Sequence, residues 1–154
     1  MRVERDDPLR DDVAALLSDH LDDMRATSPP ESVHALDPAA LAVPGITFWS
    51  ARDDDGALLG CGALKALGAD EGEVKSMRTA PEARGRGVAT TVLAVMLAEA
   101  RRRGYRAVHL ETGSQDFFAP ARRLYERHGF VERGPFADYT LDPNSTYLTL
   151  ALGA

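Results

Sequence analysis

Arg84-Gly85-Arg86-Gly87-Val88-Ala89 is the segment from which the fold is predicted most directly. It joins a predicted strand over residues 73–79 to a predicted helix over residues 88–103, where apolar residues recur at helical spacing. The first turn of a helix offers unpaired N–H groups and a positive dipole end, and glycines let a phosphate approach that backbone closely. With two arginines as cationic donors, the stretch predicts a local anion site. A glycine turn with solvated arginines is the alternative that the loop alone leaves open.

Two other phosphate-binding loops fit this stretch poorly. A Walker loop has Lys-Ser or Lys-Thr after its last glycine, where this chain has Val88-Ala89. The dinucleotide fingerprint has a third small residue three positions after its second glycine, where this chain has Thr90. A nucleotide-binding protein is therefore a weaker alternative.

The elements on both sides of the loop follow an α/β order. The predicted helices cover residues 7–24, 37–41, 88–103 and 120–128, and the predicted strands cover residues 46–51, 57–65, 73–79, 107–112, 130–133 and 146–152. The long helix connects two neighbouring parallel strands, whereas hairpins connect the others. This order predicts one domain over residues 1–154, with a mixed, mostly antiparallel sheet of six to seven strands flanked by helices.

Composition excludes several classes of protein. The chain has 24 acidic and 18 basic residues, and its net charge of −6 argues against a general nucleic-acid binder. It has neither the apolar core of a signal peptide nor the roughly 18 consecutive apolar residues of a membrane span. Cys61 is the only cysteine, so no intrachain disulfide can form. We therefore expect a soluble, cytoplasmic protein without a membrane partner.

Residues 73–130 resemble the central motifs of the GNAT superfamily of N-acetyltransferases, in its small stand-alone bacterial type. Residues 79–89 (TAPEARGRGVA) resemble the end of a strand followed by the pyrophosphate signature Arg/Gln-x-x-Gly-x-Gly/Ala. Residues 121–130 (ARRLYERHGF) resemble the second signature, Ala-x-x-Leu-Tyr-x-x-x-Gly-Phe, and a predicted strand lies between the two. The chain departs from the pattern at Phe118, where the family commonly has Asn, so one contact beside the pantetheine arm is expected to differ.

The resemblance implies a specific reaction and a specific site. Acetyl-CoA would lie between the splayed parallel strands at residues 73–79 and 107–112 and give its acetyl group directly to a primary amine in a ternary complex. The residues implied in coenzyme binding are Met77, Arg78, Thr79, Arg84, Gly85, Arg86, Gly87, Val88, Ala89, Thr90 and Phe118. The acceptor would be a small-molecule or peptide amine, no metal is expected, and a homodimer is a possible assembly. The alternative is a non-catalytic acyl-CoA sensor or interaction module of the same fold.

Several titratable residues are candidates for the proton transfers. Tyr125 matches the family tyrosine near the departing sulfur, and its phenol is a donor at neutral pH. Glu73 matches a position where some family members carry a catalytic glutamate, although a solvated glutamate is an equal alternative. Candidates on the acceptor side are Glu31, His34 and Glu111, with His109 as a weaker base and Asp138 and Tyr139 within possible reach. A covalent acyl-cysteine at Cys61 is the less favoured route, because no cationic neighbour stabilises a thiolate.

Overall fold

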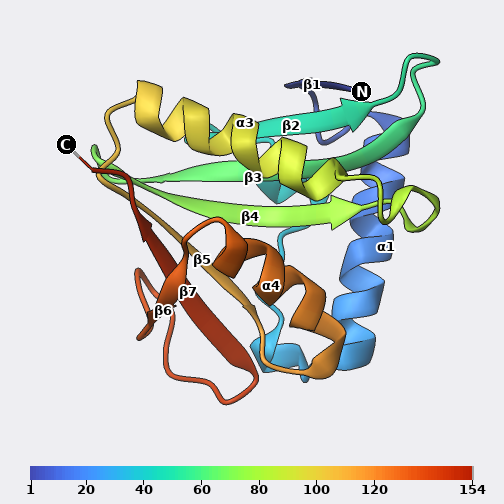
Figure 1. Ribbon diagram of the computed structural model, residues 1–154. Coiled ribbons are helices and arrows are strands. Elements are labelled where there is room, and N and C mark those ends of the chain that lie inside the picture. Colours follow the sequence, from blue (N-terminus) through green and yellow to red (C-terminus); the bar gives the residue numbers. More distant parts are fainter. Residues whose placement is uncertain (154) are drawn as a thin grey trace.

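A computed structural model describes residues 1–153 of the chain as a twisted sheet with helices packed on it (Figure 1). The strands are β1 (Arg2–Arg5), β2 (Ile46–Arg52), β3 (Leu58–Leu67), β4 (Glu71–Thr79), β5 (Ala107–Gly113), β6 (Val131–Arg133) and β7 (Ser145–Ala151). The helices are α1 (Asp11–Thr27), α2 (Pro38–Leu41), α3 (Val88–Arg102) and α4 (Ala119–Arg127), with 3₁₀ turns η1 (Pro30–Ser32), η2 (Pro81–Ala83) and η3 (Asp116–Phe118). None of the helices within residues 1–153 is both long and apolar enough to cross a membrane.

The seven strands form one mixed sheet in the order β1-β2-β3-β4-β5-β7-β6. The pairing of β4 with β5 is parallel, and the other pairings in the described residues are antiparallel. Helix α3 makes the crossover between the two parallel strands, as the sequence predicts. The predicted mixed α/β sheet of six to seven strands is therefore confirmed.

The centre of the sheet is buried on both faces, because helices cover it from each side. Strand β3 is buried without interruption from Leu59 to Leu64. Glycine at position 62 lets α3 pack close to the sheet, since a Cβ there would lie 2.7 Å from Met96 Sδ and 2.9 Å from Val92. This close packing fixes the N-terminal end of α3 beside the end of β4.

The N-terminus differs from the prediction in two respects. Strand β1 was not expected, because Val3 is its one apolar residue among charged neighbours; it pairs with β2 along the edge of the sheet. The expected helix start at Asp7-Pro8 is wrong, and α1 begins at Asp11. The Asp7 carboxylate instead accepts a hydrogen bond from the Leu9 amide at 2.9 Å, a local turn that competes with a helix cap.

Candidate active site

The loop before α3 has the geometry of an anion site. Gly85 and Gly87 have φ angles of +77° and +76°, and a Cβ on either would meet no atom within 4 Å, so open space lies above the backbone. No side chain caps the helix, and its first intrahelical bond runs from the Thr91 amide to the Gly87 carbonyl at 3.1 Å. The amides of residues 88–90 are therefore free to bind an anion at the positive end of a four-turn helix.

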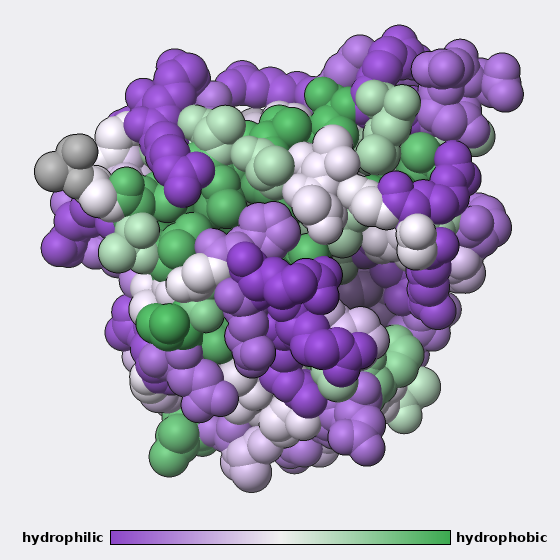
Figure 2. Space-filling view, in the orientation of Figure 1, coloured by the Kyte–Doolittle hydropathy of each residue, from purple (hydrophilic) through white to green (hydrophobic). Residues whose placement is uncertain are grey.

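A groove of about 620 Å³ runs from this loop along the end of β4 to α4. Of the residues predicted to bind coenzyme, Arg86 is exposed and does not line the groove, whereas all the others do. Arg123 and Arg127 of α4 also line it and were not anticipated. Figure 2 shows hydrophilic residues over α4 and a hollow in the surface between α4 and the end of β4. The groove thus has the size and the positive charge that a long polyanionic ligand requires.

The two parallel strands separate beside this groove. Their pairing runs from Glu71 opposite Ala107 to Val74 opposite Leu110 and then ends, although both strands continue (Figure 1). From Lys75 to Thr79, the edge of β4 that faces β5 therefore has no strand partner. Its backbone donors and acceptors are available to an extended ligand that lies between the strands.

A β-bulge redirects β4 at the point where the strands separate. Cys61 pairs with Arg78, and the next pair is Ala63 with Lys75. The chain therefore advances two residues on β3 but three on β4, so β4 holds an extra residue. Ser76 takes up the extra length with a φ angle of +55°. Bulges of this kind re-aim side chains and backbone groups, and they recur next to active sites.

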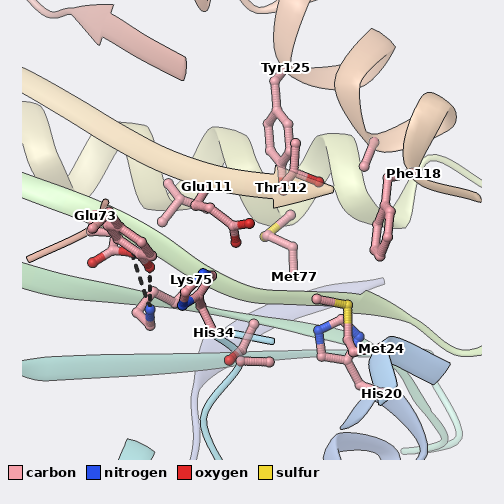
Figure 3. A pocket seen from close by; sticks show the side chains of 15 residues that line it. His20, Met24, His34, Glu73, Lys75, Met77, Glu111, Thr112, Phe118 and Tyr125 are labelled. Atoms are coloured by element: carbon pink, nitrogen blue, oxygen red, sulfur yellow. Dashed lines mark hydrogen bonds and ion pairs between the residues drawn. The ribbon is translucent and has the colours of Figure 1, made fainter. Parts of the chain in front are cut away.

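A second cavity, of about 90 Å³, adjoins the groove. His20, Met77, Phe118, Ala121 and Tyr125 line both spaces, so the two meet at these side chains. In Figure 3, Tyr125 points down from α4 toward Glu111 and Met77 at this junction. A group that ends the ligand in the groove would therefore face a second molecule in the small cavity.

Tyr125 is suited to give a proton at the junction. The side chain is 5% exposed, and burial, followed by the nearby Glu111 charge, raises the pKa of its phenol. Its ring packs edge-to-face on Phe130 at 5.7 Å between centroids. The raised pKa keeps the phenol protonated, and within residues 1–153 its hydroxyl has no hydrogen-bond partner, so it is free to donate.

Glu73 lies in the small cavity within a tight polar cluster. Its carboxylate accepts hydrogen bonds from the Tyr139 hydroxyl at 2.6 Å and from Lys75 Nζ at 3.1 Å. The Glu73 and Lys75 side chains are 3% and 9% exposed, so this ion pair is screened little by water. Burial and the charge of Glu73 raise the pKa of Tyr139, which keeps its hydroxyl a donor.

Glu111 is the second carboxylate of the cavity, and its surroundings differ. Burial raises its pKa to about 7, against the smaller opposing effects of a 2.7 Å hydrogen bond from Ser145 and of the Lys75 charge. Glu111 is therefore partly deprotonated at neutral pH, as a general base must be.

Two histidines complete the cavity wall. Burial, followed by the charge of Lys75, lowers the pKa of His34, and burial, followed by the charge of Arg78, lowers that of His20 to about 4. Both imidazoles are therefore neutral at pH 7, and His34 Nε2 is buried without a hydrogen-bond partner.

Other candidates from the sequence lie elsewhere. Glu31 is exposed and lines neither cavity. His109 lines neither cavity and bonds Glu71 Oε1 at 2.5 Å, which is a structural contact. Cys61 is 1% exposed, lines neither cavity, and has a pKa that burial raises to about 12. The sequence reasoning missed Lys75, although alternation places it on the same face of the strand as Glu73.

These features together match one class of protein, the acyltransferases. The chain belongs to the GNAT acetyltransferase family, because the family model described as "Acetyltransferase (GNAT) family" matches residues 13–130. Within residues 1–153 no three His, Cys, Asp or Glu side chains are grouped as they would be around a metal ion.

Similar proteins support the same assignment. The chain is 49% identical to the uncharacterized N-acetyltransferase YsnE of Bacillus subtilis over 152 residues, which cover 99% of this chain and 100% of that protein. It is 46% identical to the uncharacterized N-acetyltransferase YedL of Escherichia coli, with 97% and 94% covered. The crystal structure of a candidate acyl-CoA N-acyltransferase from Klebsiella pneumoniae superposes with a TM-score of 0.80 at 28% identity, covering 98% of this chain and 97% of that one. The protein is thus an acyltransferase of the GNAT family.

Proposed function

We propose that residues 1–154 act as one domain that transfers an acetyl group from acetyl-CoA to a primary amine by direct attack within a ternary complex. The observation that carries this proposal is the junction of two cavities at Tyr125. The large groove suits the coenzyme, and the small cavity suits the reacting end of an acceptor. Holding both reactants side by side makes the reaction effectively intramolecular, which removes much of the entropic barrier.

The coenzyme would lie with its pyrophosphate on the free amides of residues 88–90, with Arg84, Arg123 and Arg127 as cationic partners. Its pantetheine arm would pair with the unpaired edge of β4 and place the thioester beside Tyr125. At that point a backbone N–H beyond the bulge at Ser76 would polarise the thioester carbonyl, as a preorganised donor for the developing oxyanion.

The acceptor enters as an ammonium ion and must lose two protons. Glu111 takes the first proton, and the neutral amine then attacks the thioester carbonyl carbon. As the tetrahedral adduct collapses, the C–S bond breaks and Tyr125 protonates the departing thiolate. The second amine proton then moves through the cavity to the Tyr125 phenolate and restores the phenol. The products are the acetylamide, free coenzyme A and one proton released from Glu111 to water.

Glu111 suits the role of base better than Glu73. The Glu73 carboxylate already holds both Lys75 and the Tyr139 hydroxyl, so protonating it would disrupt a buried ion pair. Glu111 has one neutral donor, Ser145, and a pKa of about 7. We assign Glu73 to positioning Lys75.

A route through an acyl-cysteine is disfavoured, because Cys61 is buried away from both cavities with its thiol protonated at neutral pH. A non-catalytic acyl-CoA sensor would need the groove but not a second cavity with a carboxylate titrating near pH 7. The reducing cytoplasm remains the expected compartment for a chain with a single buried thiol, and a homodimer remains a prediction that analytical ultracentrifugation can test.

The deciding experiment is a turnover screen with acetyl-CoA against a broad panel of primary amines, followed by release of free thiol. We expect saturable turnover with at least one acceptor and an acetylamide product by mass spectrometry. Tight acetyl-CoA binding by calorimetry without turnover on any amine would support the sensor instead.

A further inference from the structure

Lys75 has a hydrogen-bonding capacity that the protein itself does not fill. Its ammonium group carries three donors, of which one bonds Glu73 at 3.1 Å and one bonds the Tyr139 hydroxyl at 3.0 Å. The third donor has no partner within residues 1–153. The side chain is 9% exposed and lines the small cavity, so little bulk water reaches this donor. A charged donor without a partner in a buried cavity indicates that a group of a ligand binds there.

His34 presents a second unfilled polar atom beside the first. Its Nε2 is buried without a partner, and its ring packs edge-to-face on Tyr139, which also accepts from Lys75. Figure 3 shows the His34 and Lys75 side chains close together on one wall of the cavity, with Glu111 across from them. In the tautomer that carries its proton on Nε2, neutral His34 is a donor, so two donors converge on this wall.

We propose that Lys75 and His34 bind a carboxylate of the acceptor, so that the acceptor is a small amino acid. This inference rests on the proposed acetyl transfer and names its substrate class. A carboxylate oxygen accepts the free donor of Lys75, and the other accepts from His34. The amine of the same molecule then faces Glu111 and the thioester at Tyr125.

The position of the Lys75 ammonium in the cavity wall favours this acceptor over a polycation. A carboxylate of the acceptor would accept the free donor of Lys75 and a hydrogen bond from His34, so its charge is hydrogen-bonded where it is buried. A diamine would instead bring a second cation beside Lys75, where two like charges repel. This arrangement disfavours polyamines and aminoglycosides.

The size of the cavity limits the distance between the two groups. Its volume of about 90 Å³ is below the roughly 150 Å³ of an apolar cavity that accepts benzene. Only the reacting end of an acceptor fits, so amine and carboxylate must be separated by few bonds. We therefore expect α- or β-amino acids, with longer side chains pointing out of the cavity.

The first test compares matched acceptors on the wild-type enzyme. Each amino acid in a panel is paired with its own carboxamide, which keeps the shape and the amine but removes the negative charge. We expect kcat/KM to be at least about tenfold higher for the acid, as for the loss of a charge-assisted bond. Amides or simple alkylamines that react as well as the acids would overturn the proposal while leaving acetyl transfer intact.

The second test changes the subsite. Lys75→Gln should lower kcat/KM for the acids about 10- to 100-fold and remove the preference over amides. Lys65→Gln is the matched control, because Lys65 is the other lysine of the chain and is exposed on β3. If Lys75→Gln does not fold, His34→Ala serves in its place, since His34 is only half-buried. An acid preference unchanged in either folded variant would contradict the subsite.

A third measurement does not depend on turnover. Calorimetry with the enzyme–coenzyme A complex compares N-acetyl amino acids with their carboxamides as product ligands. Tighter binding of the acids that is lost in Lys75→Gln supports the carboxylate subsite. If no amine is acetylated in that case, the proposed acetyl transfer is wrong while the subsite stands. Equal binding of acids and amides, together with normal turnover of simple amines, refutes the subsite alone.

Discussion

Replacing Glu111 by Gln should remove activity and stabilise the fold at the same time. The carboxyl has an ordinary pKa of 4.5 and a pKa of about 7 in the folded protein, because burial disfavours its charge. The folded state therefore binds this proton more tightly than the unfolded state does. The protonated Glu111 carboxyl therefore adds to the free energy of unfolding. This contribution is fully present below about pH 4.5 and is lost as the pH rises through 7. The pKa difference of about 2.5 units, at about 1.4 kcal/mol per unit, means that the ionised carboxylate costs on the order of 3 kcal/mol at pH 8.

Glutamine cannot ionise, and its carbonyl oxygen can still accept the Ser145 hydrogen bond. The free energy of unfolding of Glu111→Gln, from urea titrations, should exceed that of wild type by on the order of 1–3 kcal/mol at pH 8, and the two should converge near pH 4.5. In wild type, kcat/KM should rise about tenfold per pH unit below 7. In the variant this limb should disappear and the rate should fall about 10²- to 10⁴-fold.

Glu132→Gln is the control for this experiment, because Glu132 is exposed on β6 and does not line the cavity. Glu132→Gln should have the same free energy of unfolding as wild type at pH 8 and the same pH dependence of kcat/KM. A variant at position 111 that keeps the wild-type rate and the limb near pH 7 would refute Glu111 as the base. If Glu111→Gln is less stable than wild type at pH 8, the conclusion that the buried Glu111 carboxylate destabilises the folded protein is wrong.

Three further substitutions test the other parts of the site. Gly87→Asp puts a negative side chain at a φ of +76° beside the free amides, so calorimetry should show acetyl-CoA binding weakened about tenfold or more in a variant that still folds; unchanged affinity would move the pyrophosphate elsewhere. Tyr125→Phe keeps the ring packing and should lower kcat about 10- to 1,000-fold with little change in coenzyme affinity, whereas a wild-type rate would mean that water protonates the thiolate. Cys61→Ala should leave turnover intact and cost a modest amount of stability, and no acetyl adduct should appear in the intact mass of wild type incubated with acetyl-CoA alone.

The sequence predicted the elements around the coenzyme groove because their signals are local. Glycines, helix periodicity and strand composition near Gly87 are read within a few residues, and the structure has the expected strand, loop and helix there. The acceptor cavity could not be predicted in the same way. It brings His34, Glu73 and Tyr139 together from segments far apart in the sequence, and only the tertiary fold sets those contacts.

Strand β1 and the start of α1 show the same limit at the N-terminus. The Asp7-Pro8 pair has the composition of a helix start, but tertiary contacts decide otherwise. Asp6 accepts hydrogen bonds from Ser50 at 2.5 Å and from Arg52 at 3.2 Å, and these contacts tie the segment to β2. Local propensity is a weak prior when distant partners compete for the same residues.

The small cavity shows how two carboxylates in one site acquire different roles from their neighbours. Glu73 and Glu111 both face it, yet Glu73 is held by a buried ammonium and a phenol, whereas Glu111 has one neutral hydroxyl. A carboxylate that bonds a buried ammonium group fixes that cation in place. A carboxylate that burial alone dominates exchanges its proton near neutral pH. In the proposed mechanism, Glu73 therefore holds Lys75 ready for an anionic group of the acceptor, while Glu111 receives the proton of the amine. These two proposed functions require both residues to lie in one cavity.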